Sequence, residues 1–196
     1  MLRRRTLVAT LGTLVLVACA ALAAPAQADH RLYGWQHWSD GAGGGPGYVT
    51  IADYTGSQWP VYSAAIEWDR AASLNMVYQS GGCGGYGHCI GVRAYEFSQS
   101  CATYAGYFQA YGNSNGTHYG DSSYVRFNTR CNDRADREQR VITCHELGHV
   151  SSLGEENEAF EGQTCMAAQA GELGQASHTP RAHDFEAIAN VYGHAD

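Results

Sequence analysis

The residues Cys144-His145-Glu146-Leu147-Gly148-His149 contain a His-Glu-x-x-His pattern. On an α-helix, residues four apart differ by about 40° in azimuth, so the imidazoles of His145 and His149 project from one face and can share a metal ion. The carboxylate of Glu146 lies about 100° further round, where it can reach a metal-bound water without binding the metal itself. The pattern therefore predicts one catalytic Zn²⁺ and the hydrolysis of peptide bonds.

The flanking sequence predicts the helix that this pattern requires. Asn132 or Asp133 can cap its N-terminus, and the helix is expected to run through Val141 to about Leu153. A last helix is expected near residue 180. Its predicted features are Thr179 as cap, Pro180 in the first turn, a buried face of Phe185, Ile188 and Tyr192, and an end at Gly193.

Residues 1–28 have the three parts of a secretory signal peptide. Three arginines begin it, residues 7–24 form an apolar core, and Ala26-Gln27-Ala28 forms a small-residue cleavage site before Asp29. We therefore expect a secreted, extracellular protein with no stable membrane association. The alternative is a lipoprotein, because Leu16-Val17-Ala18-Cys19 resembles the box at which a cysteine is acylated.

Removal of the signal peptide leaves 168 residues, enough for a single domain. We expect a flexible glycine-rich segment at residues 29–47 and one domain at residues 48–196, acting as a monomer. The mature chain has nine arginines, no lysine and 19 acidic residues, giving a formal charge of −10. This charge argues against nucleic acid as a partner, since phosphate backbones are repelled.

Six cysteines remain in the mature chain, namely Cys83, Cys89, Cys101, Cys131, Cys144 and Cys165. An even number behind a signal peptide indicates three disulfides, for which 15 connectivities exist. Cys83 and Cys89 bracket the glycine-rich loop 81–87 and would staple it if they paired.

The hydrophobic pattern predicts an α+β fold with a mixed β-sheet. A strand at 48–53, a helix in which Val61, Ala65 and Trp68 share a face, and a strand at 75–78 form a β-α-β opening. Three further strands are expected at residues 90–97, 104–110 and 124–128. The loop at 113–117, with Asp121 beyond it, is rich in oxygen donors. It suggests Ca²⁺, although a hairpin turn accounts for the same residues.

This order of elements is that of zincin metalloproteases, and three segments resemble small secreted metzincin-like proteases, in particular the snapalysin-type neutral proteases of bacteria. The segments are Cys144–His149, Thr164-Cys165-Met166, and Arg181–Asp184 with the helix after it. The resemblance implies a zincin-like fold, protein or peptide substrates, and a methionine turn at Met166 beneath the metal. A Cys144–Cys165 disulfide would tie that turn to the metal-binding helix.

The resemblance also implies a third metal ligand six residues after His149, and a glycine three residues after it. Ser152 occupies the glycine position and Glu155 the ligand position, and both depart from the family pattern. With serine at 152, the helix is expected to continue to Leu153 and break at Gly154. Glu155 is favoured as ligand because two histidines and one carboxylate form a known catalytic set.

Other residues remain open as the third ligand, namely Glu156, Glu172, His183 and Asp184. His183 and Asp184 have a second explanation as first-turn residues of the last helix, where aspartate is favoured by the helix dipole. The sequence thus predicts a secreted zinc endopeptidase in which Glu146 acts as general base. The alternative is a secreted zinc-binding or interaction protein that kept the scaffold without turnover, which Ser152 and Glu155 would favour.

Overall fold

The computed structural model describes residues 37–39, 46–84, 88–112, 119–120, 122–155, 164–167 and 177–193. Several predictions lie outside these residues: the signal peptide at 1–28 with Cys19, the calcium loop at 113–117 with Asp121, and the candidate ligands Glu156 and Glu172. None of the helices in the described ranges has the length and apolar composition needed to cross a lipid bilayer.

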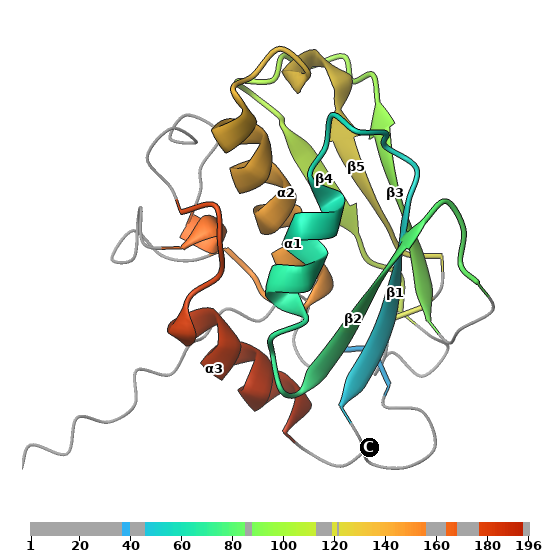
Figure 1. The fold of residues 1–196 in the computed structure, drawn as a ribbon, viewed down its shortest axis with the longest axis vertical. Helices are drawn as coiled ribbons and strands as arrows, with labels where there is room; N and C mark the ends of the chain where they lie inside the picture. The colour runs from blue at the N-terminus through green and yellow to red at the C-terminus, as the bar shows by residue number, and fades with distance from the viewer. Residues whose placement is uncertain are drawn as a thin grey trace, which may run out of the picture.

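A five-stranded mixed sheet forms one layer of the molecule (Figure 1). Its strands are β1 (Gly47–Asp53), β2 (Leu74–Ser80), β3 (Cys89–Tyr95), β4 (Gly106–Gln109) and β5 (Tyr124–Asn128). They lie in the order β2-β1-β3-β5-β4, and only β4 runs antiparallel to its neighbour. All five predicted strands are confirmed, and β4 stands at an edge.

Helix α1 (Val61–Trp68) connects the parallel strands β1 and β2, which confirms the predicted β-α-β opening. The three helices lie on one side of the sheet (Figure 1), and the core between these layers includes two tryptophans. Trp59 stacks on Phe127 of β5 with ring centroids 4.4 Å apart, and Trp68 donates from Nε1 to the carbonyl of Cys144. The predicted α+β architecture is therefore confirmed.

Helix α2 (Asp136–Val150) carries the His-Glu-x-x-His residues but begins later than predicted. Its N-cap is Ala135, so the expected cap at Asn132 or Asp133 is wrong. The reason is a 3₁₀ turn at Thr129–Cys131, for which Asn132 is the C-cap. Gln139 of α2 donates to the carbonyls of Cys131 and Asn132, which fixes the end of this turn against the helix.

Helix α3 (Ala182–Tyr192) also begins later than predicted. Its N-cap is Arg181, not Thr179, because the carboxylate of Asp184 accepts the backbone N–H of Arg181 at 2.6 Å. Thr179 is instead part of a local turn with Ser177. The predicted end at Gly193 is confirmed.

Part of the segment expected to be flexible, residues 29–47, belongs to the core. Trp38 has no exposed surface, and its Nε1 donates to the carbonyl of Val150 at 2.8 Å. Gly47 is the first residue of β1. Residues 37–39 therefore pack against the core, where the burial of a tryptophan with its N–H bonded is favourable.

Candidate metal centre

Helix α2 brings the three residues of the pattern into the interior of the molecule. His145, Glu146 and His149 are each less than a tenth exposed. The helix is covered by α1 on one side and lies beside β4 on another. Helical geometry places the two histidines on one face, as the sequence predicted.

The chain leaves α2 through a sharp turn centred on Ser152. The N–H of Ser152 donates to the carbonyl of His149, and that of Leu153 to the carbonyl of Gly148. These two bonds form a Schellman motif, which requires a left-handed residue at the position of Ser152. Ser152 adopts this conformation with φ of 72°. The predicted continuation to a break at Gly154 is therefore wrong: serine itself takes the conformation that favours glycine.

This turn directs Glu155 back to the two imidazoles. Oε1 of Glu155 lies 3.3 Å from Nε2 of His145 and 3.4 Å from Nε2 of His149, and the two Nε2 atoms are 3.0 Å apart. In a tetrahedral zinc site with bonds of about 2.0–2.1 Å, neighbouring ligand atoms are about 3.3–3.4 Å apart. The group could therefore hold a metal ion.

The hydrogen bonds of the imidazoles point to the same conclusion. Nδ1 of His145 lies 2.9 Å from the carbonyl of Cys165, and Nδ1 of His149 lies 2.8 Å from the carbonyl of Leu153. Since a carbonyl only accepts, each Nδ1 carries a proton and each neutral ring directs an Nε2 lone pair into the site. Two lone pairs and a carboxylate converge there, an arrangement that a cation stabilises.

The pKa values describe how the metal-free site holds a proton instead. Burial lowers the pKa of His145, but the nearby carboxylates of Glu155 and Glu146 raise it by more, to about 9. Burial likewise acts to raise the pKa of Glu155, but its contacts with both histidines outweigh burial and hold that pKa well below its ordinary value. The side chains of His145, His149 and Glu155 therefore favour a positive charge between them, either a proton or a metal ion.

Glu146 lies beside this group, against the inner side of β4. A Cβ at Gly106 would lie 3.0 Å from Oε1 of Glu146, so a side chain there would crowd the carboxylate. The backbone N–H of Phe108 donates to this carboxylate. Oε2 is buried and accepts no hydrogen bond from the described residues. Burial raises the pKa of Glu146, against the opposite effect of the two histidines. A buried acceptor with raised basicity suits proton transfer.

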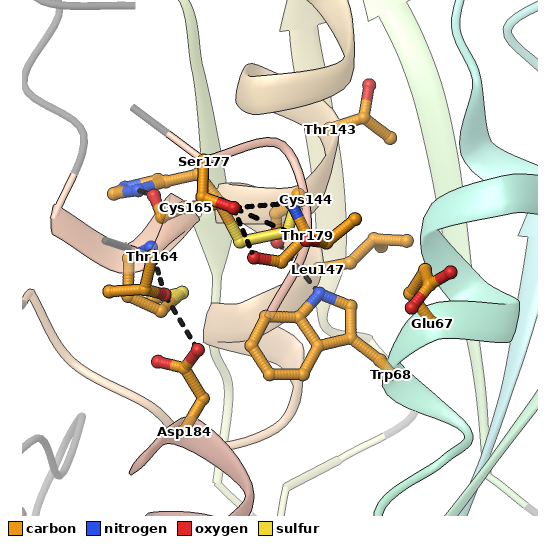
Figure 2. Close-up of a disulfide and its surroundings, with 12 residues drawn as sticks. Glu67, Trp68, Thr143, Cys144, Leu147, Thr164, Cys165, Ser177, Thr179 and Asp184 are labelled. Atoms are coloured by element: carbon orange, nitrogen blue, oxygen red, sulfur yellow. Dashed lines mark hydrogen bonds between the residues drawn. A yellow bond between two sulfur atoms is a disulfide. The ribbon is translucent and has the colours of Figure 1, made fainter. Parts of the chain in front are cut away.

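A disulfide ties helix α2 to the segment 164–167 (Figure 2), and Met166 of that segment packs against the same helix. Cys144 of α2 pairs with Cys165, as predicted, and Cys165 supplies the carbonyl that orients His145. Met166 is buried against Gly148, where an added Cβ would clash with its Sδ and lie 2.7 Å from Cζ2 of Trp68. The other two pairs are Cys83–Cys89 and Cys101–Cys131.

No family model and no curated protein matches this chain. Two solved structures of myroilysin are similar to it in fold. One has a TM-score of 0.47 at 14% identity and covers 85% of this chain and 100% of that chain. The other has a TM-score of 0.46 at 16% identity and covers 82% and 87% of the two chains.

Asp184 lies apart from the group formed by His145, His149 and Glu155. Its carboxylate is buried, accepts the hydroxyl of Thr164 at 2.7 Å, and caps α3 (Figure 2). His183 lies beside it in the first turn of α3, and neither belongs to the group that could hold a metal. Their expected use at a helix start is confirmed. Among the described candidates, only Glu155 joins the two histidines.

Sequence reasoning missed the residues that orient this group. The carbonyls of Cys165 and Leu153 bond the imidazoles, and Tyr192 bonds the hydroxyl of Ser152. The sequence alone does not show where a backbone carbonyl group will lie in the fold. Gly106 and Gly148 could have been noticed, since glycine is disfavoured inside the strand predicted at 104–110 and inside a helix.

Proposed function

We propose that this protein is a secreted zinc-dependent endopeptidase. The observation that carries the proposal is the convergence of Nε2 of His145, Nε2 of His149 and Oε1 of Glu155 within 3.0–3.4 Å, beside the buried carboxylate of Glu146. Two histidines and one carboxylate form a catalytic zinc set with a fourth position left open.

A zinc ion bound there would supply Lewis-acid polarisation of the scissile carbonyl and a lowered pKa for the attacking water. The chain's own residues do the rest. Nδ1–H bonds to Cys165 and Leu153 hold both imidazoles in the tautomer that can bind metal. Glu146 accepts the proton of the attacking water and delivers it to the leaving amine.

A peptide substrate suits the surroundings of Glu146. Strand β4 ends the sheet order, and its residues Gly106 and Phe108 adjoin the Glu146 carboxylate. An extended peptide can add to such an edge by main-chain hydrogen bonds, which would bring its backbone next to the base. The three disulfides support an oxidising, extracellular location.

The alternative, a zinc-binding protein without turnover, was favoured by the departures at Ser152 and Glu155. Ser152 takes the left-handed φ that its position requires, and Glu155 reaches the histidines. Neither departure therefore gives a reason to expect lost turnover.

The test is to measure bound zinc and casein cleavage for the purified protein and for Glu146→Gln. We expect equal zinc in both, cleavage by the unmodified protein, and a loss of at least about 10²-fold in the variant. Equal zinc without cleavage by either protein would leave the zinc-binding alternative. An unmodified protein that binds no zinc contradicts both functions.

A further inference from the structure

The face of the sheet that points away from the helices carries a cluster of tyrosines and arginines. Alternate residues of a strand point to opposite faces, so while Val92, Val125 and Phe127 enter the core, their neighbours point outward. The outer-face cluster is the name we give to six of these residues, namely Tyr54, Arg93, Tyr95, Tyr107, Tyr124 and Arg126. Ring contacts of 5.9 and 6.2 Å extend it to Tyr104 and Tyr111.

The two arginines of the cluster stand side by side. Arg93 of β3 and Arg126 of β5 are register partners on neighbouring parallel strands, which lie about 4.8 Å apart. No carboxylate of the described residues pairs with either, whereas Arg70, Arg130 and Arg134 each have a glutamate partner. Like charges opposite each other destabilise a sheet. In a chain with 19 acidic residues and 12 arginines, such a pair is a candidate binding site for an anion.

Tyrosine rings hold both guanidinium groups in place. The guanidinium of Arg126 lies 4.9 Å from the ring centre of Tyr95 and 4.4 Å from that of Tyr124, and it donates to the hydroxyl of Tyr107 at 3.0 Å. Arg93 lies 4.4 Å from the ring centre of Tyr54. Stacking covers the guanidinium faces and leaves edge N–H groups for a carboxylate. Holding them beforehand reduces the entropy lost on binding.

The cluster also offers flat apolar surface. Tyr54 is 44% exposed and Tyr95 is 55% exposed, and the flanking Tyr104 and Tyr111 are 41% and 45% exposed. The electron-rich face of a tyrosine ring attracts the weakly positive C–H groups of a sugar ring. A ligand that combines flat rings with carboxylates would use both the tyrosines and the arginines.

We propose that the outer-face cluster binds an acidic polysaccharide whose sugar units carry carboxylates, that is, a uronate polymer. Its carboxylates would pair with Arg93 and Arg126, and its rings would stack on the exposed tyrosines. An acidic peptide has carboxylates but no flat rings to cover the tyrosines. A nucleic acid carries one phosphate charge per about 1.7 Å of duplex axis, so the acidic chain repels it more strongly than a polymer with one carboxylate per sugar unit. This surface would hold the protein on a polysaccharide matrix and is independent of the metal centre.

The test is the electrophoretic retardation of the purified protein in native gels that contain polygalacturonate, dextran or polyglutamate, at low ionic strength. We expect retardation by polygalacturonate and none by dextran, with clearly weaker retardation by polyglutamate. The double variant Arg93→Gln/Arg126→Gln should bind polygalacturonate at least roughly tenfold more weakly. Tyr95→Ala and Arg93→Gln alone, both at exposed positions, should also weaken binding.

Arg70→Gln is the matched control, since Arg70 is exposed and lies over the ring of Phe185 but pairs with Glu67 on the helical side. It should bind as the unmodified protein does. A thermal unfolding curve for each variant excludes loss of fold, and Arg93→Gln tests the surface without touching the more buried Arg126. No retardation, equal retardation by polyglutamate, or equal weakening by Arg70→Gln would each overturn the proposal.

Discussion

The hydroxyl oxygen of Ser152 lies 3.1 Å from that of Tyr192, so the turn leading to Glu155 is bonded to the last turn of α3. Tyr192 also accepts the N–H of Trp38 at 3.4 Å. Trp38 and Tyr192, which lie near the two ends of the described residues, thereby stabilise the left-handed φ of Ser152. The position of Glu155 depends on this support, because only two residues separate it from the turn.

Substitutions at Ser152 should show the strain of this conformation. Ser152→Ala and Ser152→Gly both lose the bond to Tyr192, but only alanine keeps a Cβ at φ of 72°. We expect Ser152→Gly to be more stable than Ser152→Ala by about 1 kcal/mol, measured by chemical denaturation.

Ser151 provides the matched control. It is also buried, and its hydroxyl also forms a hydrogen bond, in this case to the carbonyl of Leu147, but its φ is −76°. There the order should reverse, with glycine less stable than alanine by about 0.5–1 kcal/mol. The same order at both positions would contradict a strained turn at Ser152.

Gly148→Ala should disturb the packing of Met166 against helix α2. The new methyl group would clash with Met166 and crowd Trp68, so we expect a loss of about 1–3 kcal/mol in stability. Zinc affinity, measured by competition with a chelator, should fall as well, because Gly148 lies next to His149. Adding Met166→Ala should recover part of the loss from Gly148→Ala, and a double-mutant cycle measures this recovery. Simple additivity would mean that Met166 is not the obstacle.

Glu155→Ala should lower zinc affinity, whereas Asp184→Asn should lower the stability of the fold. Removal of Glu155 takes away a proposed ligand, so zinc affinity should fall by more than the roughly 10–100-fold typical of residues that only orient ligands. Above about pH 9, where His145 is deprotonated, the stability of the metal-free protein should change little. Asp184→Asn should instead lower stability by about 1–3 kcal/mol, since the buried carboxylate accepts bonds from Thr164 and Arg181. Zinc affinity unchanged by Glu155→Ala would move the third ligand elsewhere.

His145 should link the stability of the metal-free protein to pH. Its pKa is about 9 in the folded protein, against 6.5 ordinarily, so folding favours the protonated ring. This contribution is complete below about pH 6.5 and is lost as pH rises through about 9. The raised pKa of Glu146 acts in the same direction. We therefore expect the free energy of unfolding to fall across this range.

Zinc should reverse this trend, because the metal requires deprotonated imidazoles and binds more tightly as pH rises. The gap between zinc-loaded and metal-free melting temperatures should therefore widen from pH 6.5 to 9. Glu155→Gln is the control for the metal-free trend, since it removes a carboxylate that raises the pKa of His145. Its stability should depend less on pH, and an equal dependence would exclude this origin.

The sequence predicted those features that depend on neighbouring residues. The strands follow from alternating β-rich residues, and the common face of His145 and His149 follows from a four-residue spacing. The Cys144–Cys165 bridge came from a family resemblance. Its confirmation rests on the structure alone.

Several features that the sequence did not reveal depend on distant partners. Ser152 takes a glycine-like turn that is bonded to a residue 40 positions away, and Asp184 caps α3 while bonding Thr164 20 positions away. Trp38 is ordered by a carbonyl 112 positions away. Local sequence carries no signal for such contacts, so the turn at Ser152 was misplaced. The two helix starts were misplaced for a local reason, since a 3₁₀ turn precedes α2 and Asp184 bonds the N–H of Arg181.

The bonds of Trp38 and Tyr192 have a consequence for the order of events during synthesis. The end of α2 is synthesised first, and Tyr192 is added 40 residues after Ser152. Until then, the turn at Ser152 lacks the hydroxyl that bonds it, and closing this contact requires α3 to dock first. A nascent chain would thus carry both histidines before it could hold Glu155 in place, which keeps the metal centre incomplete until α3 has been made and has docked.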